Sequence, residues 1–368
     1  MMQTVIPFGD PKAVKRWSGS LFLDVVKKSY FDRKFVSTSD NAVIQRLTDL
    51  DSSSGDTINF DLSVQLRNKP TYGDNRVDGK AENLKFFSDE VKIDQMRHQV
   101  SAGGRMSRKR TEHDLRMVAK DRLSDYWSKF IDEMHFIYLS GARGINADFT
   151  EETTWAGHAS NSIQAPDTGH IIYGGDATAK NNVDSSDVMS VTVVEKSETK
   201  ARMMRSTDPT TVNMLPVTVE GEARYVLLMS PFQEHSLRTS TTSGQWLDIQ
   251  KAAAAAEGKN NPIFKGGLGM IKNVILHSHE SVIRFSDYGS GTNLPAARAL
   301  FLGRQAGVVA YGSPASGGMR FTWVEEDADA GNEHLVTAGC IVGVKKTRFN
   351  SKDFGVMAVD TYAVDPNA

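Results

Sequence analysis

The chain has 368 residues, of which 39% are hydrophobic and 24% charged, and its formal net charge is −2. This composition is ordinary for a folded protein with a sizeable core, and the near-neutral charge gives no general reason to bind nucleic acid. The sequence has no apolar run long enough to span a membrane and no N-terminal signal-peptide pattern, so we expect neither membrane insertion nor secretion.

The first 55 residues are predicted to form an N-terminal arm. Apolar residues at helical spacing in Trp17–Val26, and again at Val43, Ile44 and Leu47, predict short helices. Between them, Tyr30–Phe35 mixes aromatic and charged side chains. Such a segment could dock onto another molecule or close over the core of its own chain, and the sequence does not decide between the two.

A long hairpin is predicted over residues 56–100. Strict alternation of apolar and polar residues in Thr57–Leu66 predicts a strand with one buried and one solvated face. The returning run, Asn83–Val100, has Leu84 and Phe86 out of phase with its other apolar residues, which predicts a β-bulge or an irregular strand. The loop between them is long for a compact domain, which is typical of a loop that is functional or ordered by a partner. Its charged residues alternate in sign: Arg67, Lys69, Asp74, Arg76, Asp78, Lys80 and Glu82.

One long amphipathic helix is predicted over Thr111–Leu139. A capping pattern at its start and Gly141 at its end set these limits. At 1.5 Å per residue such a helix is a rod of about 43 Å. The preceding segment, Arg105–Arg110, is basic; it could meet an anionic partner or form a solvated first turn. The residues expected to pack the helix onto the core are Leu115, Leu123, Trp127, Phe130 and Met134.

The rest of the chain is predicted to be a mixed α/β body. Residues 144–182 are rich in small and polar types, which favours loops and short strands. The expected helices are Ser186–Arg205, Phe232–Arg238 and Trp246–Glu257, and the expected strands are Ala223–Met229, Gly269–His277, Ala338–Val344 and Gly355–Tyr362, with two further elements at Ala296–Gly303 and Ala306–Ala310.

No catalytic, cofactor or metal site is predicted. The glycines of Gly266–Gly269 lack the spacing of a phosphate-binding loop, and no nucleophile elbow is present. His277 and His279 would share one face of a strand, but the spacing offers no further metal ligand. The acidic run Glu325–Asp329 does not match a calcium loop and is expected to be a solvated turn. The single cysteine, Cys340, lies in an apolar run and is expected to be a small buried side chain.

The order of these elements resembles the HK97-like fold of the major capsid proteins of tailed bacteriophages, and more narrowly the N4-gp56 family. An arm, a long hairpin with a charged loop, a long helix, a mixed body and returning C-terminal strands follow one another in that order. Each motif alone is weak, and their shared order makes the resemblance specific. The motifs are Lys15–Ser18, Gly55–Ile58, Val77–Glu82, Val91–Arg97, Leu139–Gly141, Tyr225–Pro231, Asn261–Phe264 and Gly266–Gly269, together with Arg110, Leu115, Arg116, Ala119, Leu123 and Trp127 of the helix.

The resemblance implies an α+β fold with four named parts. Residues 1–55 would be the N-terminal arm and residues 56–100 the E-loop hairpin. Residues 101–179 and 336–368 would form the P-domain, with the long helix as its spine, and residues 180–335 the A-domain. The charged residues of the hairpin loop would contact a neighbouring copy of the chain, where alternating signs set register more than they add affinity.

The resemblance also implies a function. The chain would be a major capsid protein, without enzymatic activity or cofactor, that assembles into hexamers and pentamers of an icosahedral shell around viral DNA. Its partners would be copies of itself, a portal protein, scaffold or decoration proteins, and packaged double-stranded DNA touched non-specifically. It would have no membrane contact, and it would assemble in the host cytoplasm and end in the virion. Two alternatives stay open from the residues alone: a hydrolase whose site is built from dispersed carboxylates and histidines, and a nucleic-acid-binding protein that uses Arg105–Arg110.

Overall fold

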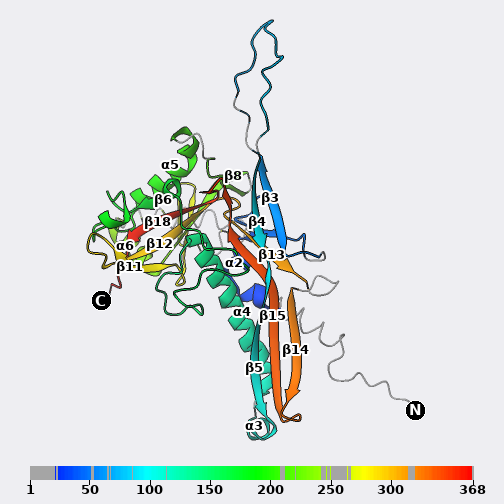
Figure 1. Ribbon diagram of the computed structural model, residues 1–368. Coiled ribbons are helices and arrows are strands. Elements are labelled where there is room, and N and C mark those ends of the chain that lie inside the picture. The colour runs from blue at the N-terminus through cyan, green and yellow to red at the C-terminus, as the bar shows by residue number, and fades with distance from the viewer. Residues whose placement is uncertain are drawn as a thin grey trace.

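The computed structural model describes the chain apart from residues 1–20, 22–23, 51–53, 64–65, 67, 85, 113, 208–211, 220, 242–245, 247–248, 250–262, 264–266, 314–319 and 367–368. Figure 1 shows three parts. A narrow layer of one long helix and a sheet runs down the molecule, a second sheet with its helices lies to one side, and a hairpin projects beyond both. The predicted α+β class is confirmed.

The narrow layer is built on the helix α4 (Leu115–Ser140). The Asp114 side chain accepts hydrogen bonds from the backbone N–H groups of Arg116 and Met117, which caps the first turn. Gly141 ends the helix with φ 70°, in the left-handed region that glycine enters without strain. The helix begins later than the predicted Thr111, because the basic segment forms a separate short helix, α3 (Arg105–Arg110), and the cap falls at Asp114.

The helix α4 packs against a six-stranded sheet. The longest strand is β15. Along one edge it pairs first with β14 and then with β13, and along its other edge it pairs with β5. The short strands β1 and β2 extend the sheet beyond β13. The strands are β1 (Val36–Ser37), β2 (Ile44–Leu47), β5 (Asp94–Gly104), β13 (Gly307–Gly312), β14 (Phe321–Ala328) and β15 (Glu333–Lys346).

Two sequence predictions in this layer are wrong. The segment with Val43, Ile44 and Leu47 was expected to be helical, but β2 runs parallel to β13, where β-branched side chains are buried by sheet packing. The acidic run was expected to be a solvated turn, but its first four residues, Glu325–Ala328, belong to β14 and only Asp329 lies in the turn. Cys340 is 1% exposed, as expected.

The second sheet has eight strands in the order β6-β18-β12-β8-β10-β9, with β11 beside β12 and β7 beside β8. Its strands confirm the apolar runs in the sequence, except that Gly269–His277 forms a tight hairpin of two strands instead of one, with Lys272 at the turn at φ 51°. The strands are β6 (Ile171–Tyr173), β7 (Val217–Val219), β8 (Glu222–Met229), β9 (Gly269–Ile271), β10 (Val274–Ser278), β11 (Arg284–Tyr288), β12 (Leu294–Leu302) and β18 (Val356–Tyr362).

Helices accompany this sheet, as Figure 1 shows. The predicted helix at Ser186 begins five residues later, as α5 (Val191–Thr207), and α6 (Pro231–Ser240) matches the predicted Phe232–Arg238. The predicted helix Trp246–Glu257 falls mostly outside the described residues. Short elements complete the chain: α2 (Tyr30–Lys34), η1 (Thr168–His170), η2 (Lys180–Asn182), β16 (Arg348–Phe349) and β17 (Lys352–Asp353). No helix in the described part of the chain has the length and apolar character needed to cross a membrane.

The two sheets divide the chain differently from the predicted domain boundaries. The strands β13 and β14, expected in the 180–335 segment, pair with β15 beside α4. The last strand, β18, expected with the long helix, pairs with β12 in the eight-stranded sheet. Boundaries placed by position along the sequence missed this, because sheet partners are set by apolar register and not by proximity in the chain.

A buried ion pair joins the two parts. The Arg298 guanidinium on β12 donates to both carboxylate oxygens of Asp360 on β18, at 2.7 Å each, and to the backbone carbonyl of Ser140 at the end of α4, at 3.0 Å. Tyr288 completes the network by donating to Asp360 at 2.6 Å. The guanidinium therefore fixes the end of the long helix to the centre of the eight-stranded sheet.

Candidate functional site

The projecting hairpin consists of β3 (Thr57–Ser63) and β4 (Phe86–Lys92), paired antiparallel. At its base, Ile58 and Val91 lie in a buried cluster with Leu50, Val308 and Ala310. The pairing is regular over the whole described ladder, so the predicted bulge is absent from that stretch. The predicted hairpin continued to Val100, but strand pairing with β3 ends at Lys92 and the chain turns into β5 of the other sheet.

Polar contacts clasp the base of the hairpin to the body. The Asn161 side chain hydrogen-bonds to the backbone of Lys92 as a neighbouring strand would. Its amide oxygen accepts the N–H of Lys92 at 3.0 Å, and its amide nitrogen donates to the Lys92 carbonyl at 2.7 Å. On the other side, Lys345 on β15 donates to the carboxylate of Asp89 and to the carbonyl of Glu90. The hairpin is therefore held firmly at its root, while its far end extends away from the body (Figure 1).

The far end carries the charged residues that were predicted to contact a neighbouring chain. Glu82 is half-buried and accepts the backbone N–H of Asn68 at 2.8 Å, which ties the two sides of the loop together. The predicted contact Arg67 lies outside the described residues. The other predicted residues are exposed, and in the described part of the chain none of them forms an ion pair: Lys69, Asp74, Arg76, Asp78 and Lys80.

The charged residues are not the whole of this surface. Large apolar side chains are also exposed along the same segment, and the sequence prediction named none of them as contacts: Leu66, Tyr72, Val77, Leu84 and Phe86. One signal was available, because Leu84 and Phe86 broke the apolar alternation of the returning strand. That break was interpreted as a bulge, whereas the regular ladder puts Phe86 opposite Ser63, on the polar face of the hairpin.

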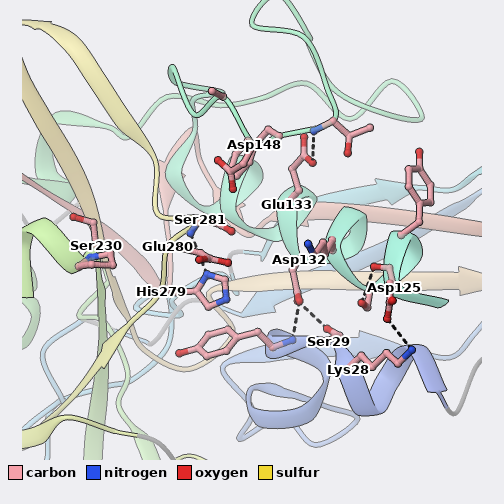
Figure 2. Close-up of a pocket in the computed structure, with 18 of the residues that line it drawn as sticks. Lys28, Ser29, Asp125, Asp132, Glu133, Asp148, Ser230, His279, Glu280 and Ser281 are labelled. Atoms are coloured by element: carbon pink, nitrogen blue, oxygen red, sulfur yellow. Dashed lines mark hydrogen bonds and ion pairs between the residues drawn. The ribbon is translucent and has the colours of Figure 1, made fainter. Parts of the chain in front are cut away.

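A large groove of about 1280 Å³ lies beside the middle of α4 (Figure 2). Its walls come from α2, from α4, from the loop at residues 147–150 and from the loop between β10 and β11. Asp132 on α4 faces the start of α2 and accepts hydrogen bonds from Ser29 Oγ at 2.7 Å and from the N–H groups of Tyr30 and Phe31 at 2.7 and 3.0 Å. This carboxylate docks the described part of the N-terminal arm onto the long helix.

The neighbouring carboxylate has a comparable role. Glu133 accepts the N–H groups of Thr150 and Glu151 at 2.8 and 2.9 Å and so holds the loop that follows α4. His279 accepts the N–H of Ser281 through Nδ1 at 3.1 Å, and burial lowers its pKa. The groove therefore uses Asp132, Glu133 and His279 to hold segments of the chain in place.

The residues that the sequence offered as weak candidates for metal or anion binding also make contacts within the fold. His277 is buried, its Nε2 lies 2.8 Å from the carbonyl of Ile263, and burial lowers its pKa to about 4. Among the described residues no group of three or more His, Cys, Asp or Glu side chains could hold a metal ion. The segment Arg105–Arg110 is exposed over most of its length as α3, where Arg105 and Arg108 donate to the carbonyls of Gly331 and Asn332.

The residues predicted to pack the long helix lie mostly in the core. Leu123 and Met134 are fully buried, and Trp127 and Phe130 are 1% and 5% exposed. Leu115, at the first position of α4, is half-buried. The helix thus has one buried face along its first half and is enclosed on all sides in its second half, where every residue from Phe130 to Ser140 is buried.

The buried acids predict a pH dependence of stability that the variant Asp32→Asn should expose. Burial, and then the nearby charge of Asp132, raise the pKa of Asp32 from 3.8 to about 7, while Arg46 and Arg320 lower it in part. The folded state thus binds more protons than the unfolded state between those two values, so this group's contribution to stability falls as the pH rises through that window. Asp32→Asn should therefore raise the thermal unfolding midpoint of unassembled subunits at pH 8, and the gain should shrink towards pH 5.

A comparison with wild type at each pH is required, because His135 acts in the opposite direction. Burial lowers the pKa of that imidazole to about 4, and it therefore costs stability as the pH falls. The matched control is Asp121→Asn, at an exposed position of α4, which should show no pH-dependent gain. A midpoint of Asp32→Asn at pH 8 equal to or below that of wild type would contradict the assignment.

Comparisons with known proteins agree with one another. A family model described as phage capsid protein matches residues 5–365. The major capsid protein of Pseudomonas phage KPP25 is 24% identical, over 90% of this chain and 91% of that protein.

Among solved structures, the capsid of Ralstonia phage GP4 is 62% identical, with a TM-score of 0.88 and complete coverage of both chains. The capsid of cyanophage Pam1 has a TM-score of 0.71 at 21% identity, covering 92% of this chain and 93% of that one, and so supports the fold.

Proposed function

This chain belongs to the phage capsid protein family, and from that premise we propose how its parts build a shell. The protein is a major capsid protein, a subunit of which many copies form the capsid of a phage. The narrower assignment to the N4-gp56 family stays a prediction.

The hairpin β3–β4 is the E-loop, and its loop at residues 66–86, here called the tip, contacts a neighbouring copy. The observation that carries this proposal is the projection of the tip away from the body, with five large apolar side chains strongly exposed and with Lys69, Asp74, Arg76, Asp78 and Lys80 exposed beside them. An element with a rigid root and an unpartnered end is suited to reach onto another subunit. The root is supplied by Asn161 and Asp89.

The two sheets supply the remaining parts of the subunit. The layer of α4 with β5, β14 and β15 is the P-domain, and the eight-stranded sheet with α5 and α6 is the A-domain. A contact in which one surface of a subunit meets a different surface of the next must close into rings, and we propose hexamers and pentamers of one icosahedral lattice.

Other partners follow from the role of a shell. The assembled lattice would join a portal protein and scaffold or decoration proteins in the host cytoplasm. Packaged double-stranded DNA would be touched non-specifically, and α3, with four cations in six residues, is the segment whose charge fits that contact. The comparisons give no support to the alternative of a hydrolase.

Trypsin protection tests the proposed contact of the tip. Arg76 and Lys80 are exposed in the isolated subunit. Trypsin should therefore cut unassembled protein within the tip, and particles visible by negative-stain electron microscopy should resist the same cut. Dissociating the particles should restore cleavage, which serves as the control. A tip that is cut equally fast in intact shells would contradict the assignment, as would protein that stays monomeric with its tip resistant to trypsin.

A further inference from the structure

The tip carries an unusual concentration of exposed apolar side chains. Only twelve large hydrophobic residues are strongly exposed in the described part of the chain, and five of them lie in the short segment from Leu66 to Phe86. We call these five the apolar anchors. They are Leu66 at 58% exposed, Tyr72 at 70%, Val77 at 67%, Leu84 at 63% and Phe86 at 59%.

The position of Phe86 shows that these side chains do not belong to the hairpin's own core. One face of the ladder is apolar. It carries the pair Ile58 and Val91, which is buried at the base, and further along the pair Leu62 and Phe87. Phe86 pairs with Ser63 on the opposite face, among polar neighbours. This phenylalanine is 59% exposed and therefore leaves most of its surface uncovered.

The charged residues of the tip are poorly suited to supply affinity. Five of them, Lys69, Asp74, Arg76, Asp78 and Lys80, are exposed and carry both signs. Exposed ion pairs contribute roughly 0–1 kcal/mol each and weaken with salt. Fully burying one apolar side chain contributes roughly 1.5–3 kcal/mol. Contacts at the centre of protein interfaces are likewise made by aromatic and aliphatic side chains, with a polar rim around them.

We propose that the apolar anchors, and not the charged residues, supply the affinity of the tip for a second copy of this chain, while the charges set its register. This inference rests on the proposed function of the tip and names which of its side chains do the binding. It predicts that assembly is strengthened or unchanged by added salt, because salt favours the burial of apolar surface, whereas it screens and weakens exposed ion pairs.

Two double variants separate the contributions. In Tyr72→Ser with Val77→Ser the charges stay and two anchors go, whereas in Asp74→Asn with Arg76→Gln the anchors stay and one charge of each sign goes. The first variant should raise the critical concentration for assembly, measured by sedimentation, by at least about tenfold, which corresponds to about 1.4 kcal/mol. The second should change it by less than about threefold. All four side chains are exposed, so circular dichroism and the unfolding midpoint of the subunits should not change.

A fluorescence measurement checks burial directly. Tyr72→Trp places an indole at the most exposed anchor, and the difference spectrum against wild type should shift to shorter wavelength when shells form. An unshifted spectrum in complete shells would overturn the proposal, and so would a serine variant that assembles as well as wild type or a charge variant that is the more damaging of the two. If shells instead form normally without the whole tip, the proposed contact itself fails, which is a distinguishable result.

Discussion

A chain that lacks residues 67–82, with a two-residue Asn-Gly turn in their place, is expected to fold normally and to form no shells. The fold should survive because five of the deleted charges, Lys69, Asp74, Arg76, Asp78 and Lys80, make no ion pair in the described part of the chain. The hairpin base also keeps its buried cluster and its contacts with Asn161 and Lys345. Assembly should fail because the deletion removes all the charged residues proposed as contacts and two of the five apolar anchors, Tyr72 and Val77, and shortens the hairpin that carries the other three. An Asn-Gly turn closes a two-stranded ladder without strain.

Two measurements decide this prediction. Calorimetry and circular dichroism of the soluble subunit should match wild type, and sedimentation with electron microscopy should show no particles at concentrations at which wild type assembles. The deleted chain keeps its body and thus any surface that receives a neighbour's tip, so it should also lower the yield of shells when mixed with wild type. Normal shells from the deleted chain alone would show that the hairpin is not the assembly contact.

The sequence predicted the parts of this molecule that have a strong local signal. Alternation over Thr57–Leu66 predicted β3, and apolar spacing with Gly141 predicted α4, because in both cases one face of a single element is buried. The short helix α6 was also predicted, and in the structure Ser230 and Gln233 form a capping box around its first residue, Pro231.

The errors occurred where partners far along the chain decide the structure. The segment Ile44–Leu47 has helical spacing by itself, but it becomes a strand because β13 lies beside it. The run after Lys92 was predicted to continue the hairpin, but it pairs with β15 instead, in nine residue pairs from Asp94 with Val342 to Gly104 with Glu333. Local patterns do not contain such partners, since tertiary contacts override local preference.

The projecting loop was predicted from the sequence, but its exposed apolar side chains were not. A long loop with alternating charge indicated a contact region, and the structure shows this loop projecting, with no ion pair at Lys69, Asp74, Arg76, Asp78 or Lys80 among the described residues. Its apolar residues were overlooked because a break in alternation suggests a bulge when the strand partner is unknown. Once the register is known, the break in alternation at Phe86 is explained by an exposed aromatic side chain on the solvated face of the hairpin.

The variant Trp127→Ala is expected to destabilise the unassembled subunit by about 3–5 kcal/mol, the usual cost of truncating a buried large aromatic residue. Trp127 is 1% exposed and contacts Phe130 and Phe321 edge to face, at ring-centre distances of 6.0 and 5.8 Å. Because Phe321 lies on β14, removing the indole would leave a cavity between the long helix and its sheet. The measurement is the free energy of unfolding from a denaturant titration.

Two further variants show whether the loss comes from packing. The indole N–H of Trp127 has no hydrogen-bond partner in the described residues, so Trp127→Phe removes an unsatisfied donor along with one ring and should cost clearly less than the alanine variant. Val118→Ala, at a 43% exposed position of the same helix, should change the free energy of unfolding by less than about 0.5 kcal/mol. A loss below about 1 kcal/mol for Trp127→Ala would mean that α4 is not held to the sheet by this side chain.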